Sequence, residues 1–211
     1  MIGARHAVCW LLVLFPAAIS VSAEESDKAA SINTKVLSAL NLTDVTGRQH
    51  QPFDDRRTKA VVLLFVSTDC PVANTFQPYL QDFERVYAKK GVRCFMVYCS
   101  PGLEREQIDK HTRDFQIHMS AVLDAKQQLA RITGAKVTPE AIMIDRSGKV
   151  RYRGLINDLY AGYGRKRAQP TKHFLRDACD AVIAGKMVPN PVTKSLGCFI
   201  HFETSEPKAT K

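Results

Sequence analysis

The segment from Val61 to Val66 is an unbroken apolar run that is rich in β-branched residues. It is too short for a buried helix and suits a central strand that is covered on both faces. Turn-forming residues 67–69 follow, and then Cys70 and Pro71, whose fixed φ suits a first helical turn. Beyond them, apolar residues recur at helical spacing, which predicts one helix that runs to about Lys90 and ends at Gly91.

The remaining pattern predicts further strands and helices in alternation. These are a hairpin around Thr46-Gly47, strands over 92–99 and 120–123, helices over 103–115 and 127–132, a hairpin over 141–153, and a helix that ends at Gly185. This order predicts an α/β fold with a central mixed β-sheet and helices on both faces.

Two stretches fall outside this core. The segment from Gly154 to Pro170 is polar and rich in glycine, and it predicts a mobile loop or a binding element. The tail, residues 189–211, contains an apolar segment around Gly197 and Cys198, which we expect to dock on the body of the domain. The compact domain is therefore expected over residues 36–188.

The N-terminus has the pattern of a secretory signal peptide. An apolar stretch from Ala7 to Ile19 follows Arg5, and Val21-Ser22-Ala23 fits a cleavage site. We expect residues 1–23 to be removed, residues 24–35 to form a flexible lead-in, and the mature protein to be periplasmic or extracellular. An uncleaved anchor is the alternative. No second long apolar run follows, so no stable membrane insertion is expected after cleavage.

The composition and charge of the chain limit the kinds of partner that we expect it to bind. The 211 residues carry a formal net charge of +9 that is spread along the chain, with one denser run at 165–167. No nucleic-acid-binding motif accompanies the charge, so no nucleic-acid partner is predicted. Oligomeric state leaves no signature in the sequence.

Cys70 is the main candidate for chemistry. The pattern places it between a buried strand and the N-terminus of a helix, where unpaired N–H groups and the helix dipole favour a thiolate. A buried structural cysteine would instead sit inside the apolar run.

Three stretches together resemble the redoxin branch of the thioredoxin-like superfamily, which includes alkyl hydroperoxide reductase and thiol-specific antioxidant relatives. They are the strand–turn–Cys70-Pro71–helix corner, Val137-Thr138-Pro139 before an apolar run, and the opening hairpin of residues 40–48. The resemblance covers roughly Ile32 to Lys186. It implies a thioredoxin-like fold, a cis-proline at Pro139 beside the active cysteine, and an extended substrate chain paired with that proline's backbone.

The sequence departs from the family's dithiol motifs, because Ala73 and Asn74 occupy the positions three and four residues after Cys70. A partner for Cys70 must come from farther away. Cys198 is the first candidate and Cys99 the second, while a structural role remains open for Cys198. Cys94 and Cys179 are expected in the core. His111, on a predicted surface helix, receives no role.

The predicted function is thiol–disulfide exchange with protein or small-molecule thiols and disulfides, with Cys70, Pro139 and Cys198 as site residues. One alternative is a peroxidase like the peroxiredoxins. Ser67 fits the serine or threonine that these carry three residues before the cysteine, but Leu63 stands where they carry a proline. The arginine that polarises the peroxide would be Arg151 or Arg153. Another is a Sco-like copper-binding or redox-sensing module, with Cys70, Cys198 and His201 as copper ligands. Otherwise no cofactor is expected.

Overall fold

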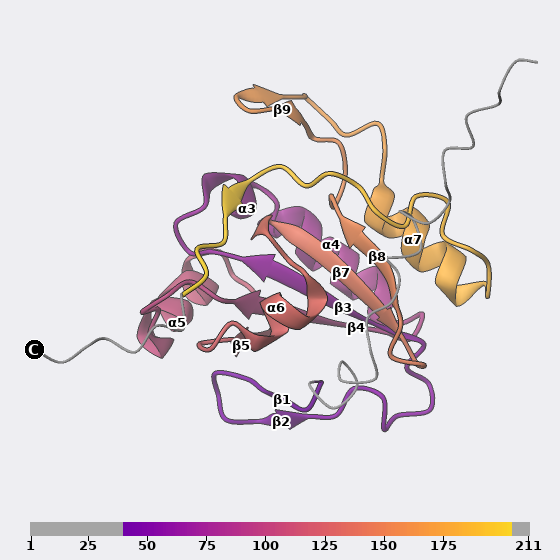
Figure 1. Ribbon diagram of the computed structural model, residues 1–211, viewed down its shortest axis with the longest axis horizontal. Coiled ribbons are helices and arrows are strands. Elements are labelled where there is room, and N and C mark those ends of the chain that lie inside the picture. The colour runs from indigo at the N-terminus through magenta and orange to yellow at the C-terminus, as the bar shows by residue number, and fades with distance from the viewer. Residues whose placement is uncertain (1–39, 204–211) are drawn as a thin grey trace, which may run out of the picture.

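The computed structural model describes residues 40–203, so the expected signal peptide and lead-in lie outside the described part of the chain. Its centre is a five-stranded sheet in the order β5-β4-β3-β7-β8 (Figure 1). The parallel strands are β3 (Ala60–Val66), β4 (Val92–Tyr98) and β5 (Ser120–Leu123). The antiparallel strands are β7 (Glu140–Asp145) and β8 (Val150–Gly154). β3 is buried over its whole length, as expected for a strand covered on both faces.

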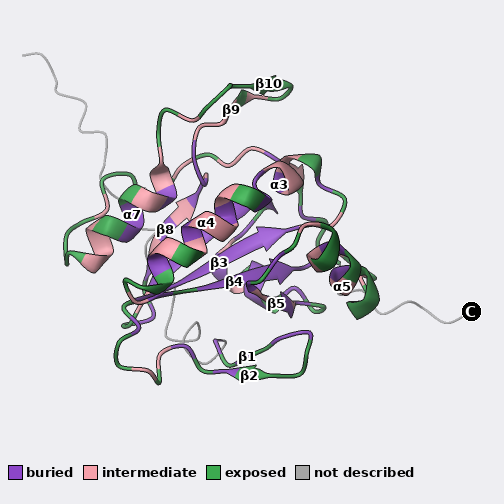
Figure 2. Cartoon of the chain, turned by 180° about the vertical axis from the view of Figure 1, so that it is seen from behind, coloured by how far each residue is buried: buried purple, intermediate pink, exposed green. Residues whose placement is uncertain are grey.

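Helices cover the two faces of this sheet unequally. On one face lie α4 (Gln77–Ala88), α5 (Arg105–Asp114) and α7 (Phe174–Ile183), whose buried apolar residues form one cluster with alternate β3 residues (Figure 2). On the other face lie α6 (Gln128–Thr133) and the hairpin of β1 (Leu42–Thr43) and β2 (Gln49–His50). Because strand side chains alternate between faces, β3 contributes to both clusters of buried apolar residues.

The single helix expected after Cys70 is in fact two. α3 spans Pro71–Thr75, and α4 begins at Gln77 after a break at Phe76. Pro78 explains the break, because it has no N–H to donate and its ring would clash with the carbonyl of Asn74 in a continuous helix. The short α3 therefore carries the cysteine corner as a separate element.

The segment expected as a polar loop contains a small hairpin instead. β9 (Tyr160–Gly162) and β10 (Arg165–Lys166) pair antiparallel and form an arm that projects beyond the main sheet (Figure 1). The Tyr160 hydroxyl donates to Thr75 Oγ1 at 3.1 Å, and its ring packs near Phe76. The arm is thereby joined to the end of α3.

A further two-stranded pairing joins the C-terminal segment to the body. β6 (Val137–Thr138) pairs antiparallel with β11 (Cys198–Phe199). In Figure 1 the C-terminal segment runs from α7 over the top of the sheet to α3. None of the helices within residues 40–203 has the length and apolar character needed to cross a membrane.

Candidate functional site

Cys70 lies at the corner that the sequence predicts, directly after β3 and at the N-cap of α3. Its place after the apolar run indicated a side chain that reaches solvent, but this expectation is wrong, since Cys70 is 1% exposed. The Ala73 amide donates to its sulfur at 3.5 Å, and the protonated thiol donates to the Thr138 carbonyl at 3.0 Å. The Thr138–Pro139 peptide bond is cis, as the resemblance implied. Cys70 and Pro139, far apart in sequence, thus belong to one site.

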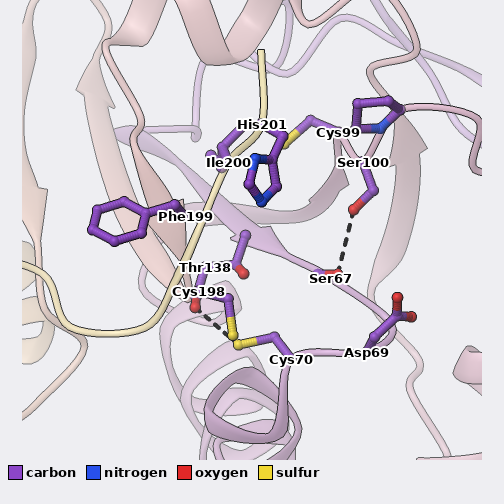
Figure 3. A pocket seen from close by; sticks show the side chains of 11 residues that line it. Ser67, Asp69, Cys70, Cys99, Ser100, Thr138, Cys198, Phe199, Ile200 and His201 are labelled. Carbon is purple, nitrogen blue, oxygen red and sulfur yellow. Dashed lines mark hydrogen bonds between the residues drawn. The ribbon is translucent and has the colours of Figure 1, made fainter. Parts of the chain in front are cut away.

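Cys198 reaches the same place from the C-terminal segment. Its sulfur points toward the Cys70 sulfur, and the Cys70 Sγ to Thr138 O bond lies beside it (Figure 3). Both cysteines are free thiols in this structure. The position is fixed by β11, in which Cys198 stands opposite Thr138 and Phe199 opposite Val137. The first candidate partner of Cys70 is therefore the one that the fold brings to it.

The two thiols differ in acidity. Burial alone would raise the pKa of Cys70, but hydrogen bonds from the Cys198 thiol and the Ala73 amide outweigh burial and lower it below its usual value. The pKa of Cys198 is raised to about 11 by burial, by its hydrogen bond to Cys70, and by the negative charges of Cys70 and Asp69. At neutral pH, Cys70 is the thiol that ionises more readily, and Cys198 stays protonated beside it.

Cys99, the second candidate partner, lies just after β4 and lines a pocket next to Cys70. It is 2% exposed, and burial raises its pKa to about 12. No hydrogen bond joins it to Cys70 in the described part of the chain, whereas the Cys198 thiol donates to Cys70. Cys94 and Cys179 are buried in the other face of the core, as expected.

A buried chain of hydrogen bonds supports the corner from behind. The Asn74 side-chain amide donates to the Thr68 carbonyl at 2.9 Å, and its oxygen lies 2.9 Å from His111 Nε2. His111 Nδ1 lies 3.0 Å from the Tyr98 hydroxyl. Burial lowers the pKa of His111, which favours a neutral ring that donates to Asn74 and accepts from Tyr98. The loop before Cys70 is thus fixed to β4 and α5.

The sequence reasoning missed His111, because it placed the residue on a surface helix. The histidine is 5% exposed. A signal was present: His111 is three residues after Ile108 and four before Phe115, so all three lie on one side of α5. That side faces the sheet.

His201 lines the pocket beside the two thiols, but it does not complete a copper site. Within residues 40–203, no group of three or more histidine, cysteine or acidic side chains is close enough together to hold a metal ion. Of the three residues considered as copper ligands, Cys70 and Cys198 therefore lie together, while the His201 imidazole stays apart from them.

The arginines considered for a peroxidase also lie elsewhere. Arg151 is 3.6 Å from the Asp145 carboxylate, and Arg153 donates to the Gly134 carbonyl at 3.5 Å. No arginine is among the described residues that line the pocket, and Leu63 is fully buried in β3. Only Ser67 remains near Cys70 from the peroxidase pattern.

Known proteins resemble the chain in both sequence and structure. A sequence model of the Redoxin family matches residues 25–159. The thiol-disulfide oxidoreductase ResA of Geobacillus thermodenitrificans is 30% identical over 110 residues, which make up 52% of this chain and 62% of the relative. The chain thus matches less than two thirds of the length of this curated relative.

Two solved structures match most of the described fold. An uncharacterized conserved protein from Geobacillus kaustophilus has a TM-score of 0.69 at 25% identity, with 79% of this chain and 90% of that chain covered. A hypothetical protein from Sinorhizobium meliloti has a TM-score of 0.67 at 25% identity, with 78% and 91% covered. The α/β thioredoxin-like fold predicted from the sequence is confirmed. With a family match over more than half of its length, the chain belongs to the Redoxin family.

Proposed function

We propose that the protein is a thiol–disulfide oxidoreductase in which Cys70 is the nucleophile and Cys198 the resolving thiol. The observation that carries the proposal is the contact between these two thiols at the cis-Pro139 corner. The name of the ResA relative, which shares 110 aligned residues, supports the same class of reaction.

The chemistry follows from the difference in acidity. The Cys70 thiolate attacks a sulfur of the substrate disulfide, a Cys70–substrate mixed disulfide forms, and one substrate thiolate leaves. Cys198 then loses its proton and attacks the Cys70 sulfur, which closes the Cys70–Cys198 disulfide and releases the second substrate thiolate. The substrate disulfide is reduced and the protein dithiol is oxidised. The low pKa of Cys70 favours the first step.

The proposal includes export, since the signal-peptide pattern of residues 1–23 would deliver the dithiol to a compartment where disulfides persist. N-terminal sequencing of the protein from its native host tests this part. A mature chain that begins at Glu24 is expected, and an intact N-terminus would contradict cleavage.

The test of the chemistry is disulfide exchange with a model protein disulfide. Cys70→Ser should abolish turnover, because no other thiol of lowered pKa lies at the corner. Cys198→Ser should stop after one step, with the substrate held as a mixed disulfide on Cys70. Cys94→Ala is the matched control, because Cys94 is buried in β4 beside Val62, near the start of β3, whereas Cys70 follows the end of that strand. Full activity in Cys70→Ser would refute the assignment.

A further inference from the structure

The backbone edge beside Cys70 is already occupied. β11 fills the free edge of β6, with Cys198 opposite Thr138. The approach is so close that a Cβ on Gly197 would lie 2.0 Å from the Thr138 carbonyl oxygen. An extended polypeptide that paired with β6 would need the same hydrogen-bonding groups. While the tail is docked, a protein substrate therefore cannot pair there.

The tail is fixed on both sides of Cys198. The Tyr163 hydroxyl of the β9–β10 arm donates to the Gly197 carbonyl at 3.3 Å, and the Ile200 amide donates to the Lys136 carbonyl at 2.9 Å. Farther on, the Gln127 side chain donates to the His201 carbonyl at 2.7 Å and accepts from the Glu203 amide at 2.8 Å. These contacts involve the backbone, so they do not depend on the redox state of Cys198.

A pocket remains open next to the docked tail. It has a volume of about 340 Å³ and lies between the cysteine corner, the end of β4 and the tail (Figure 3). Ser67 and Ser100, whose hydroxyls are 3.3 Å apart, form its polar wall. The volume suits a small molecule and is too small for a folded partner.

The charge of the lining is one-sided. Among the described residues that line it, Asp69 is the only acidic one and is exposed, no lysine or arginine contributes, and His201 is the only other residue that can carry a charge besides the cysteines. The pocket therefore complements a positively charged group, although the chain as a whole carries an excess of basic residues. The two cysteine sulfurs are also presented differently, because Cys70 is buried under the Thr138 carbonyl while Cys198 is partly exposed.

We propose that the reductant of the Cys70–Cys198 disulfide is a small thiol bearing a positively charged amine, which enters this pocket and attacks the Cys198 sulfur. The inference rests on the proposed function, and it names the substrate class and the sulfur that this substrate meets.

The steps balance with two thiols. The first thiolate forms a bond to Cys198, the Cys198–Cys70 bond breaks, and its electron pair leaves on Cys70. A second thiolate attacks the sulfur of the bound thiol, forms the small disulfide, and leaves Cys198 as a thiolate that takes up a proton. Two small thiols are oxidised and one protein disulfide is reduced. Cys70 leaves as a thiolate to which the Ala73 amide donates, and this hydrogen bond does not need the Cys198 thiol.

The test compares two thiols of similar size and opposite charge, cysteamine and 3-mercaptopropionic acid, as reductants of the oxidised full-length mature protein. Rates are expressed per thiolate and divided by the rate of each thiol with 2-hydroxyethyl disulfide, a neutral reference, so that the different acidities and nucleophilicities of the two thiols cancel. The normalised rate of cysteamine should be about fivefold higher, as expected for one partly solvated charge pair. Asp69→Asn should remove this ratio, and Asp54→Asn, an exposed aspartate outside the pocket lining, should keep it.

Acid quenching before completion, followed by peptide mass spectrometry, identifies the attacked sulfur. A cysteamine adduct on Cys198 supports the inference, and an adduct on Cys70 overturns it. Equal normalised rates for the two thiols, or faster reduction by a reduced thioredoxin than by cysteamine, would also overturn it. If the Cys70–Cys198 disulfide does not form at all, the proposed function itself fails, so the two failures are distinguishable.

Discussion

At the scale of single residues, the site depends on one thiol acting as a hydrogen-bond donor to another. Cys198 supplies the donor that helps to lower the pKa of Cys70, and the same contact raises the pKa of Cys198 to about 11. The two thiols therefore lose a first proton readily, and the hydrogen bond between the two sulfurs stabilises the resulting negative charge. The positions of the two cysteines alone decide that Cys70 is the nucleophile and that Cys198 keeps its proton, and no histidine or lysine belongs to the pair.

This contact predicts the effect of removing the donor. Cys198→Ala should raise the pKa of Cys70, because the thiolate loses the hydrogen bond from the neighbouring thiol. Titration of the ultraviolet absorbance of the thiolate measures the change. Cys198→Ser is the matched control, since its hydroxyl keeps a donor at the same place, and it should shift the pKa less. An unchanged pKa in the alanine variant would contradict the assigned role of Cys198.

At the scale of secondary structure elements, the corner is held by the link from α3 through α5 to β4. Asn74, His111 and Tyr98 each come from a different element and share one chain of hydrogen bonds. Because the ring is buried and its pKa is lowered, protonation of His111 would leave a buried charge and break its acceptance from Tyr98.

The sign of the pH effect follows. A histidine whose folded-state pKa lies below the unfolded value binds its proton more readily after unfolding, so stability rises with pH through this range and is lost as pH falls below about 6.5. The carboxylates of Asp114 and Asp69 oppose burial here but do not reverse it.

We therefore expect His111→Phe to flatten the pH dependence of the free energy of unfolding between about pH 5 and 7. Denaturant unfolding at several pH values measures it. His118→Phe removes an exposed histidine and serves as the control. The same slope in parent and His111→Phe proteins would show that His111 does not cause the effect.

Local pattern was sufficient for the elements that local chemistry determines. The apolar run of β3, the hairpin at Gly47 and the short helix expected over 127–132 are all found where the sequence places them. The break at Phe76 was missed although Pro78 signals it, because the apolar spacing continues across the break. The β9–β10 hairpin was missed because its strands are short and polar and depend on contacts with distant elements such as Thr75.

At the scale of the whole molecule, the site is assembled by the docking of the tail. Sequence could nominate Cys198 as a partner, but it could not give the register that places Cys198 opposite Thr138, since that register depends on segments 60 residues apart. It also could not show that His201 stays apart from the two thiols. Such relations are properties of the folded chain, and no local pattern encodes them.

Gly197 is the point at which this docking is most sensitive. Gly197→Ala should push the tail away from β6, because the added methyl group would meet the Thr138 backbone. Cys198 would then be less often near Cys70, and the equilibrium between dithiol and disulfide should shift toward the dithiol. A redox titration with a dithiothreitol buffer measures the shift.

Gly162→Ala is the matched control. Gly162 also has no positive φ, and a Cβ there would be in ordinary contact, 3.8 Å from Arg165. It should leave the redox equilibrium unchanged. An unchanged equilibrium in Gly197→Ala as well would mean that the close approach of β11 to β6 does not control the pair.

The pairing of β11 with β6, which places Cys198 beside Cys70, has a consequence for the connectivity of the chain. When the proposed disulfide closes, residues 70 to 198 become one covalent ring that contains four of the five strands of the main sheet, whereas β3 and the β1–β2 hairpin precede it. Closing a ring of this size restricts the unfolded chain by about 5 kcal/mol in the chain-entropy description. Oxidation would thus raise the melting temperature and the resistance to proteolysis, so the lifetime of the protein would depend on the redox state of its surroundings.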